Sequence, residues 1–165
     1  MSPAPPVGVV VPVYRDVDDL RRCLESVVRH APGLHTPFEL VLIDDDSPEP
    51  AVREYLDAFV ARPAPMPVVL LRNEHNLGFV GTMNRGLARA TGDVVMLNAD
   101  TVVTAGWLDR LAEVAAGADV ATVTPLTNHG SICTLPDSII AAFRLDGDDP
   151  AIDECAEFVS TRSLA

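Results

Sequence analysis

The sequence of 165 residues has a mass of 17.6 kDa, which fits one ordinary domain and is too long for a lone helical hairpin. Hydrophobic residues make up 48% and charged residues 22%, close to globular averages, and this composition excludes a disordered tail or a coiled coil. The 24 acidic and 12 basic residues give a formal charge of -12, and because such a surface repels polyanions, nucleic acid is not an expected partner.

The chain begins with a short apolar run followed by an amphipathic segment. The β-branched run at 7–13 is typical of a strand buried on both faces of a sheet. Asp16 or Asp18 can cap a helix after it, and this helix is expected to end before Pro32. Its apolar positions follow helical spacing and are Leu20, Leu24, Val27, Val28 and Ala31.

The same strand-helix unit repeats in the next segment. Residues 38–43 predict a second strand. Asp46 or Ser47 is expected to cap the helix that follows, with Pro48 at its first position. The apolar stripe of this helix is Val52, Leu56, Phe59 and Val60.

A third and a fourth unit are also predicted. Residues 68–71 read as a strand, and a loop through Asn76 and Gly78 leads into a helix that is expected to end at Gly92. A fourth strand is expected at 93–97. The helix after it is expected to start near Thr104, with Trp107, Leu108, Leu111 and Val114 on one face.

A fifth strand is predicted at 120–124, after which the pattern weakens into a loop-like stretch at 126–136 and a short helix at 152–159. Strands that alternate with helices favour right-handed crossovers and a mostly parallel sheet. The predicted fold class is therefore α/β, a Rossmann-like sheet flanked by helices.

The cysteines and the apolar runs bear on location. Cys23, Cys133 and Cys155 are odd in number and widely spaced, which fits neither a disulfide framework nor a CxxC zinc site. Residues 1–6 lack the features of a signal peptide, and no apolar run reaches the length of a membrane span. A cytoplasmic location is expected, with any membrane association made through a partner.

Ligands of open α/β sheets bind beyond the carboxyl ends of the strands. The first strand-helix turn contains neither GxGxxG nor GxxxxGK[ST], so a glycine-rich phosphate loop is disfavoured there. Tyr14, at this turn, could stack on a planar base or simply pack over the sheet edge. Its position alone does not separate the two.

Three consecutive carboxylates follow the second strand. Their mutual repulsion requires counter-charges or hydrogen-bond donors. Asp46 is expected to cap the next helix, whereas Asp44 and Asp45 are equally suited to a structural role or to accepting an N–H from a base.

Asn98 and Asp100 follow the fourth strand. In extended backbone, residues two apart point the same way, so their oxygens could share one partner. Mg²⁺ or Mn²⁺ held by one or two protein oxygens plus substrate phosphates suits that pattern, although an isolated polar pair of this kind ordinarily stabilises a turn.

Taken in order and spacing, several segments resemble glycosyltransferase family 2, whose members have the GT-A fold and use nucleotide sugars with inversion. The segments are VVVPVY at 9–14, IDDDS at 43–47, NLGF at 76–79, NRG at 84–86, GD at 92–93 and LNADT at 97–101. The resemblance covers residues 7–125 closely and the remainder loosely.

The resemblance implies roles for several residues on the donor side. Pro12 and Tyr14 would flank the nucleotide base, and Asp45 would accept its imino N–H. Gly78 and Asn84 would line the donor pocket.

The family's DxD motif falls on Asn98, Ala99 and Asp100. By this resemblance Asp100 would reach the metal ion bound to the diphosphate, either Mg²⁺ or Mn²⁺, and the backbone of Ala99 would lie near the ribose. Asn98 stands where many members have Asp, which predicts weaker binding of the divalent ion because one negative charge is missing.

The family's general base lies beyond the donor half, and no counterpart is recognisable before Ala165. The acids of the C-terminal segment are Asp146, Asp148, Asp149, Asp153 and Glu154, and none is assigned as catalytic. The resemblance therefore implies a donor-binding subdomain at 1–125 and the start of an incomplete acceptor-side region at 126–165.

The function that the resemblance implies is transfer of a sugar from a UDP- or dTDP-type donor to a hydroxyl of a glycan, lipid-linked or other acceptor, as in polysaccharide biosynthesis. A noncatalytic nucleotide-binding or protein-interaction module with the same fold is the alternative. A nucleotidylyltransferase-like protein is disfavoured because the first turn carries no phosphate loop rich in glycine and lysine.

Overall fold

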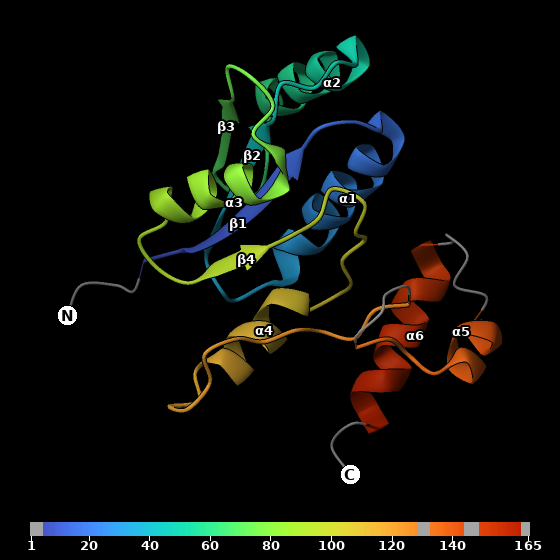
Figure 1. The fold of residues 1–165 in the computed structure, drawn as a ribbon. Helices are drawn as coiled ribbons and strands as arrows, with labels where there is room; N and C mark the ends of the chain where they lie inside the picture. Colours follow the sequence, from blue (N-terminus) through green and yellow to red (C-terminus); the bar gives the residue numbers. More distant parts are fainter. Residues whose placement is uncertain (1–4, 129–132, 144–148, 163–165) are drawn as a thin grey trace. The chain divides into compact units, whose positions relative to one another are not determined.

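The computed structural model describes residues 5–128, 133–143 and 149–162, and the chain divides into two compact units, residues 1–103 and residues 104–165 (Figure 1). The first unit contains a four-stranded sheet in the order β3-β2-β1-β4, and every neighbouring pair is parallel. Its strands are β1 (Val7–Val13), β2 (Phe38–Asp44), β3 (Val68–Arg72) and β4 (Val94–Met96). The predicted α/β class with a parallel sheet is confirmed.

Helices α1 (Val17–His30), α2 (Pro50–Ala61) and α3 (Gly78–Arg89) join these strands, with a short 3-10 turn at Ala31–Gly33 after α1. The chain runs from β1 to β2 to β3 in one direction and then returns to the other side of β1. Right-handed crossovers therefore place α1 and α2 on one face and α3 on the other. In agreement, α1 contacts α2, while α3 contacts β1 and β2 (Figure 1).

Helix α3 packs unusually close to the central strand. A Cβ atom at Gly86 would overlap the side chain of Val10 and lie 3.3 Å from Cδ1 of Ile43. Val10 and Ile43 form a buried cluster with Val41 and Met83. Glycine at position 86 thus allows this packing, which fixes where α3 begins relative to the ends of β1 and β2.

The second unit contains α4 (Trp107–Ala115), α5 (Asp137–Phe143) and α6 (Asp149–Arg162). Helices α5 and α6 contact each other, and the rings of Phe143 and Phe158 lie 5.3 Å apart between centroids. The helix expected at 152–159 is confirmed as the longer α6, and α5 was not predicted. Within the described ranges, no helix combines the length and the apolar character that crossing a membrane requires.

The fifth strand predicted at 120–124 is wrong. These residues form no ladder, and Val120 is 39% exposed. Their β-branched side chains favour extended backbone, but a strand needs a neighbouring strand and a packed face, and this segment has neither in the described chain.

Two of the predicted helix starts shift. Helix α4 begins at Trp107, after Gly106 in the left-handed region at φ 68°, and not near Thr104. Helix α2 begins at Pro50 and not at Pro48, with Glu49 at its N-cap. In the segment before α2, the Asp44 carboxylate accepts the backbone N–H of Ser47 at 2.9 Å, and the Ser47 hydroxyl accepts the N–H of Glu49 at 3.4 Å, so these bonds replace the first turn that the helix was expected to make.

The predicted apolar stripes are confirmed except at their ends. On α2, Val52, Leu56 and Phe59 are buried, whereas Val60 is 37% exposed. Val114, predicted for the inner face of α4, is 54% exposed. Val60 directly follows a buried residue, and one helical step of about 100° turns its side chain away from the core.

Candidate functional site: a pocket at the ends of β1 and β4

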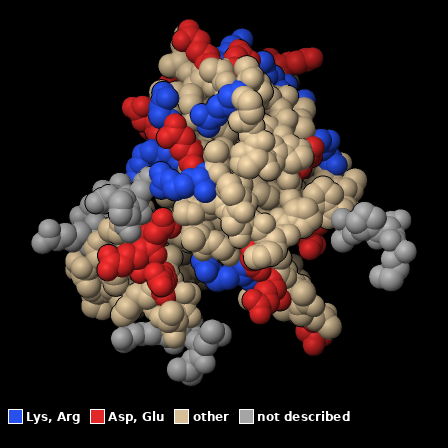
Figure 2. Space-filling model, turned by 180° about the vertical axis from the view of Figure 1, so that it is seen from behind, with Lys and Arg blue, Asp and Glu red and all other residues tan. Residues whose placement is uncertain are grey.

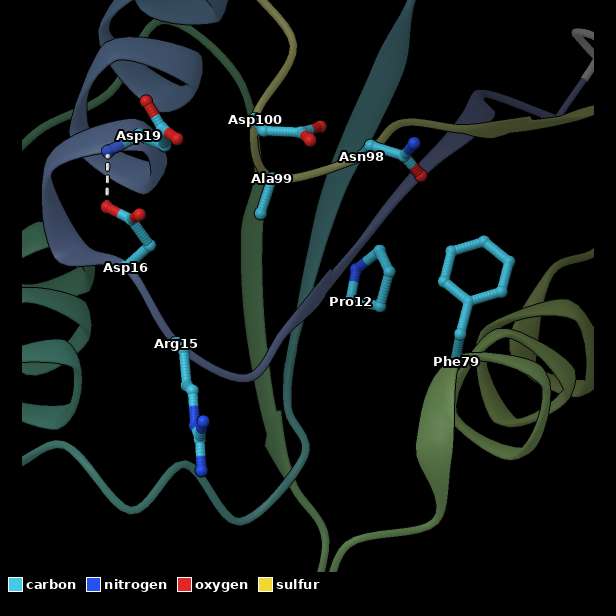
Figure 3. A pocket seen from close by; sticks show the side chains of 8 residues that line it. All are labelled: Pro12, Arg15, Asp16, Asp19, Phe79, Asn98, Ala99 and Asp100. Atoms are coloured by element: carbon cyan, nitrogen blue, oxygen red, sulfur yellow. Dashed lines mark hydrogen bonds between the residues drawn. The ribbon is translucent and has the colours of Figure 1, made fainter. Parts of the chain in front are cut away.

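A surface pocket of about 390 Å³ lies at the carboxyl ends of β1 and β4 in the first unit (Figure 3). These two strands are neighbours at the point where the strand order reverses, which is where open α/β sheets bind ligands. The volume is within the range of small-molecule sites. The lining residues are Pro12, Arg15, Asp16, Asp19, Phe79, Asn98, Ala99 and Asp100.

One wall of the pocket is the turn between β1 and α1. Asp16 caps α1, as predicted, and its carboxylate accepts the backbone N–H of Asp19 at 3.3 Å (Figure 3). Its own N–H donates to Glu49 at 3.1 Å, and its backbone lies in the left-handed region at φ 63°. The cap and the contact with Glu49 together fix the direction in which α1 leaves the sheet.

The opposite wall is the loop after β4. The N–H of Thr101 donates to the carbonyl of Asn98 at 3.1 Å, so residues 98–101 form a turn. The extended backbone expected at 98–100 is therefore wrong, because pairing with β1 ends at Leu97, whose N–H donates to the carbonyl of Val10 at 2.9 Å, and the chain turns after it. Asn98 and Asp100 nevertheless line the same pocket, and both side chains are exposed (Figure 3).

Phe79 reaches the pocket from the first turn of α3, on the side of Pro12 (Figure 3). Its side chain is 56% exposed. Pro12 and Phe79 thus offer apolar surface at one end of the pocket, while the carboxylates lie at the other.

The charge of the pocket is negative. Three of its lining residues are the carboxylates Asp16, Asp19 and Asp100, and one, Arg15, is basic. Figure 2 shows one face of the molecule, where the basic side chains of the described residues are interspersed with acidic ones. A phosphate group that entered this pocket would be repelled unless a cation accompanied it.

The residues of the pocket fit a divalent ion of the hard class. Asn98 and Asp100 present amide and carboxylate oxygens, which Mg²⁺ and Mn²⁺ prefer, and their exposure leaves room for phosphate and water oxygens. Within the described residues, no group of three or more His, Cys, Asp or Glu side chains could hold a metal ion alone. Such an ion would need oxygens from its ligand.

The three carboxylates after β2 have separate environments. Asp44 is fully buried, lies 3.5 Å from Nε of Arg72, and has Arg53 at 4.0 Å. Asp46 is exposed at φ 56° and does not cap α2, contrary to prediction. The expected repulsion is thus relieved by arginine at Asp44 and by solvent at Asp46.

Asp45 is 3% exposed, and its Oδ1 accepts hydrogen bonds from the Asn73 amide at 2.6 Å and from the Leu77 N–H at 2.8 Å. Burial alone would raise the pKa of this carboxyl, but the hydrogen bonds from Leu77, Asn73, Thr82 and Gly78 outweigh it and lower the pKa. Asp45 is therefore an ionised, internally bonded carboxylate that holds the loop before α3.

The amide of Asn73 has a fixed orientation. Arg85 of α3 donates to its oxygen, and the amide nitrogen donates to both Asp45 and the hydroxyl of Thr82, the latter at 2.9 Å. Asn73 and Thr82 are buried. Asn73 thus meets Asp45 only as a donor, which keeps the carboxylate an acceptor.

Of the residues predicted for the site, the pocket brings together Pro12, Asn98, Ala99 and Asp100. The other four lie outside its lining. Tyr14 is 39% exposed, and the Arg15 guanidinium lies 5.0 Å from its ring centroid. Gly78 starts α3 at φ 70°, and Asn84 is exposed on the same helix. Asp45 is buried beneath the loop before α3.

The sequence interpretation assigned no site role to Arg15, Asp16, Asp19 or Phe79. Asp16 was considered only as a helix cap, and Phe79 was quoted in a motif without a role. For Arg15 and Asp16 the signal that could have found them is position, since they lie two and three residues after the carboxyl end of β1, where open α/β sheets bind ligands. Asp19 and Phe79 lie further from any strand end and had no such signal.

Cys23 and the acids of the C-terminal segment were also weighed as reactive groups. Cys23 is buried, and burial raises the pKa of its thiol to about 12, so it is not a thiolate nucleophile. Asp153 accepts the N–H of Ala105 at 3.4 Å within the second unit. Asp146 and Asp148 lie outside the described residues.

Residues 8–138 match the family model described as glycosyl transferase family 2. A probable N-acetylgalactosaminyltransferase 7 of Caenorhabditis elegans is 33% identical over 134 residues, which are 80% of this chain and 20% of that protein. An undecaprenyl-phosphate 4-deoxy-4-formamido-L-arabinose transferase of Serratia proteamaculans is 31% identical over 116 residues, 70% of this chain and 35% of that protein. The chain thus spans about a third or less of these relatives.

A similar solved structure is a mannosyltransferase of Pyrobaculum calidifontis in complex with GDP-Man and Mn²⁺. It superposes with a TM-score of 0.61 at 22% identity over 72% of this chain and 34% of that one. TarS of S. aureus in complex with UDP superposes with a TM-score of 0.54, also at 22% identity, over 67% of this chain. The shared feature is the fold.

Proposed function

The chain belongs to glycosyl transferase family 2, and from that premise we propose that it binds the nucleotide-sugar donor of a glycosyl transfer reaction. The observation that carries this proposal is the pocket at the ends of β1 and β4, which is lined both by Asn98 and Asp100 and by the apolar Pro12 and Phe79. A nucleotide diphosphate has a matching pair of parts, an anionic diphosphate and a planar base.

In the proposed complex, Asp100 and Asn98 would hold Mg²⁺ or Mn²⁺, with oxygens of the bound diphosphate completing the site. Such an ion supplies charge neutralisation for the leaving diphosphate. The negative lining of the pocket supports this assignment, because a diphosphate without a cation would be repelled by Asp16, Asp19 and Asp100.

The base is proposed to lie between Pro12 and Tyr14, with its imino N–H donated to Asp45. Since Oδ1 of Asp45 already receives the N–H groups of Asn73 and Leu77, the second oxygen is the proposed acceptor. A carboxylate held as an acceptor suits a base with a ring N–H, which uracil, thymine and guanine carry, and disfavours cytosine, whose ring nitrogen is itself an acceptor. A UDP- or dTDP-type donor is the proposed member of this set.

Gly78 and Asn84 are proposed to line the sugar side of the donor pocket, and the backbone of Ala99 to lie beside the ribose. Residues 1–125 form the proposed donor part, and residues 126–165 begin the acceptor side. Transfer with inversion forms a bond between the acceptor oxygen and the anomeric carbon and breaks the bond to the diphosphate, while a base takes the hydroxyl proton. No described residue is assigned to that base.

The proposed acceptor is a hydroxyl of a glycan or of a lipid-linked sugar. The transferase that shares 31% identity is named for undecaprenyl-phosphate, which supports a lipid-linked acceptor as one class to test. A reducing, cytoplasmic compartment is proposed because all three cysteines, each within the described residues, are free thiols.

Calorimetric titration tests the proposed function directly. UDP, dTDP and CDP are titrated into the full chain with Mn²⁺ and with EDTA, and circular dichroism confirms that the protein is folded. We expect UDP or dTDP to bind more tightly than CDP, and more tightly with Mn²⁺ than without it. A folded protein that binds neither UDP nor dTDP would refute a donor of this type.

A second measurement separates a transferase from a noncatalytic module. Release of UDP from UDP-sugars is followed in the presence of candidate acceptors. Tight binding of UDP without any release would favour the nucleotide-binding module with the same fold.

A further inference from the structure

The inner face of α1 contacts the loop that carries Asn98 and Asp100. Ser26 is fully buried on this face. Its hydroxyl donates to the carbonyl of Cys23 at 2.7 Å and accepts the backbone N–H of Val103 at 3.0 Å. Because the single hydroxyl proton is directed to Cys23, a lone pair is left facing Val103. The hydroxyl therefore fixes the C-terminal end of the loop.

Cys23 makes the matching contact at the other end of the loop. Its side chain is fully buried, and its Sγ lies 3.5 Å from the carbonyl oxygen of Asn98, to which the thiol donates. The same carbonyl also accepts the N–H of Thr101. Four residues, 99–102, separate the two points at which α1 holds the loop.

Helix α1 thus takes part in both walls of the pocket. Asp16 and Asp19, at its N-terminal end, line one wall directly. One to two turns further along the helix, Cys23 and Ser26 hold the backbone of the opposite wall. A shift of the loop relative to α1 would change the separation between Asp100 and the two carboxylates of α1.

We propose that Ser26 and Cys23 are positioning residues that hold the 98–103 loop in the shape in which the oxygens of Asn98 and Asp100 face one divalent ion. This inference rests on the proposed function, because the ion is the one assigned there to the diphosphate. Residues that orient metal ligands typically alter metal affinity roughly 10- to 100-fold when changed.

A positioning role and a purely structural role of Ser26 predict different effects on the gain in UDP affinity that Mn²⁺ provides. A buried serine that only satisfied hydrogen bonds would affect the stability of the whole fold and leave the ion-dependent part of binding unchanged. A positioning residue affects the gain in UDP affinity that Mn²⁺ provides, and leaves binding in EDTA nearly unchanged.

Calorimetry with UDP tests this difference in Ser26→Ala, Cys23→Ala and Ser26→Thr. We expect Ser26→Ala to reduce the Mn²⁺-dependent gain roughly tenfold and Cys23→Ala to reduce it less, because a thiol is a weak donor. Ser26→Thr keeps the hydroxyl and restores the gain.

Val52→Ala is the matched control for loss of stability. Val52 is fully buried on α2, which carries none of the residues that hold the 98–103 loop, and its truncation leaves a cavity in the core. We expect Val52→Ala to lower the melting temperature and to keep the full Mn²⁺-dependent gain. An equal loss of the gain in Val52→Ala and Ser26→Ala would overturn the inference.

Hydrogen exchange provides a readout that needs neither metal nor nucleotide. In Ser26→Ala, the amide of Val103 is expected to exchange at least roughly tenfold faster than in the wild type, while the amides of β1 stay protected. Unchanged exchange at Val103 would contradict the positioning role.

The two proposals fail in different ways. A wild-type protein that binds no nucleotide overturns the proposed function, and the inference with it, even where Val103 exchanges faster. A wild type that binds UDP with Mn²⁺, together with a Ser26→Ala variant that keeps the full gain, overturns the inference alone.

Discussion

Asp45 and Asp100 both lie beyond the carboxyl ends of strands at the same edge of the sheet, yet their environments are opposite. Asp45, after β2, is 3% exposed, and its Oδ1 receives the N–H groups of Asn73 and Leu77. Asp100, after β4, is exposed and lines the pocket. Asp45 therefore bonds within the protein, whereas the carboxylate of Asp100 is open to a ligand.

The difference follows from how each carboxylate is satisfied. A buried carboxylate must receive hydrogen bonds from its own chain, so Asp45 contributes to holding the loop before α3 as well as to any ligand. An exposed carboxylate exchanges water for a ligand at little cost to the fold. Substitution should thus change stability at Asp45 and ligand binding at Asp100.

The largest expected effect is on stability in Asp45→Ala. This change leaves the Asn73 amide and the Leu77 N–H without their acceptor, and we expect the free energy of unfolding to fall by about 2–4 kcal/mol. Asp100→Ala is expected to change it by less than about 0.5 kcal/mol. Urea denaturation followed by circular dichroism measures both. Equal losses in the two variants would remove the distinction between these sites.

The next effect is on binding in Asp100→Ala. We expect the gain in UDP affinity from Mn²⁺ to fall roughly 10- to 100-fold, because the carboxylate proposed to hold the ion is gone. Asp93→Ala is the control, since Asp93 is an exposed acid at the opposite end of β4 and should keep the full gain. A gain that survives in Asp100→Ala would place the ion elsewhere.

The pH dependence of the unfolding free energy tests whether Asp45 is ionised in the folded protein. The pKa of Asp45 lies below its ordinary value of 3.8 in the folded protein, so its ionised form stabilises the fold above that pH and the contribution is lost as the pH falls through the folded pKa. Between about pH 5 and pH 3, the unfolding free energy of Asp45→Asn should fall less steeply than that of the wild type. Identical slopes in urea titrations would argue against an ionised Asp45.

The smallest expected effect is on ion affinity in Asn98→Asp. A second carboxylate beside Asp100 should raise the Mn²⁺-dependent gain roughly threefold and weaken UDP binding in EDTA. Ala58→Asp adds the same charge at an exposed position of α2 and should change neither value. A loss of the gain in Asn98→Asp would show that the amide has a role that a carboxylate cannot replace.

Much of the fold could be predicted from the sequence because its signals are local. The β-branched runs of β1 and β2, the cap at Asp16 and the buried stripe of α1 each depend on neighbours within a few residues. The strand predicted at 120–124 failed for the complementary reason, since a strand depends on a partner that its own residues do not specify. The predicted start of α2 was wrong because the Asp44 carboxylate accepts the N–H of Ser47 and the Ser47 hydroxyl accepts the N–H of Glu49, so the helix begins only at Pro50.

The candidate site likewise has residues that local sequence signals predicted and residues that only the packing of the fold brings to it. Hydrophobic period and motif order run along the chain, so the parallel α/β class and the carboxyl-end residues Pro12, Asn98, Ala99 and Asp100 could be predicted from the sequence. Three further facts required the folded chain: Asp45 is bonded internally, Asp19 and Phe79 enter the pocket, and Ser26 holds the 98–103 loop. These facts depend on which segments pack together in space, and the physical cause is that buried polar groups find their partners across the fold and not along the sequence.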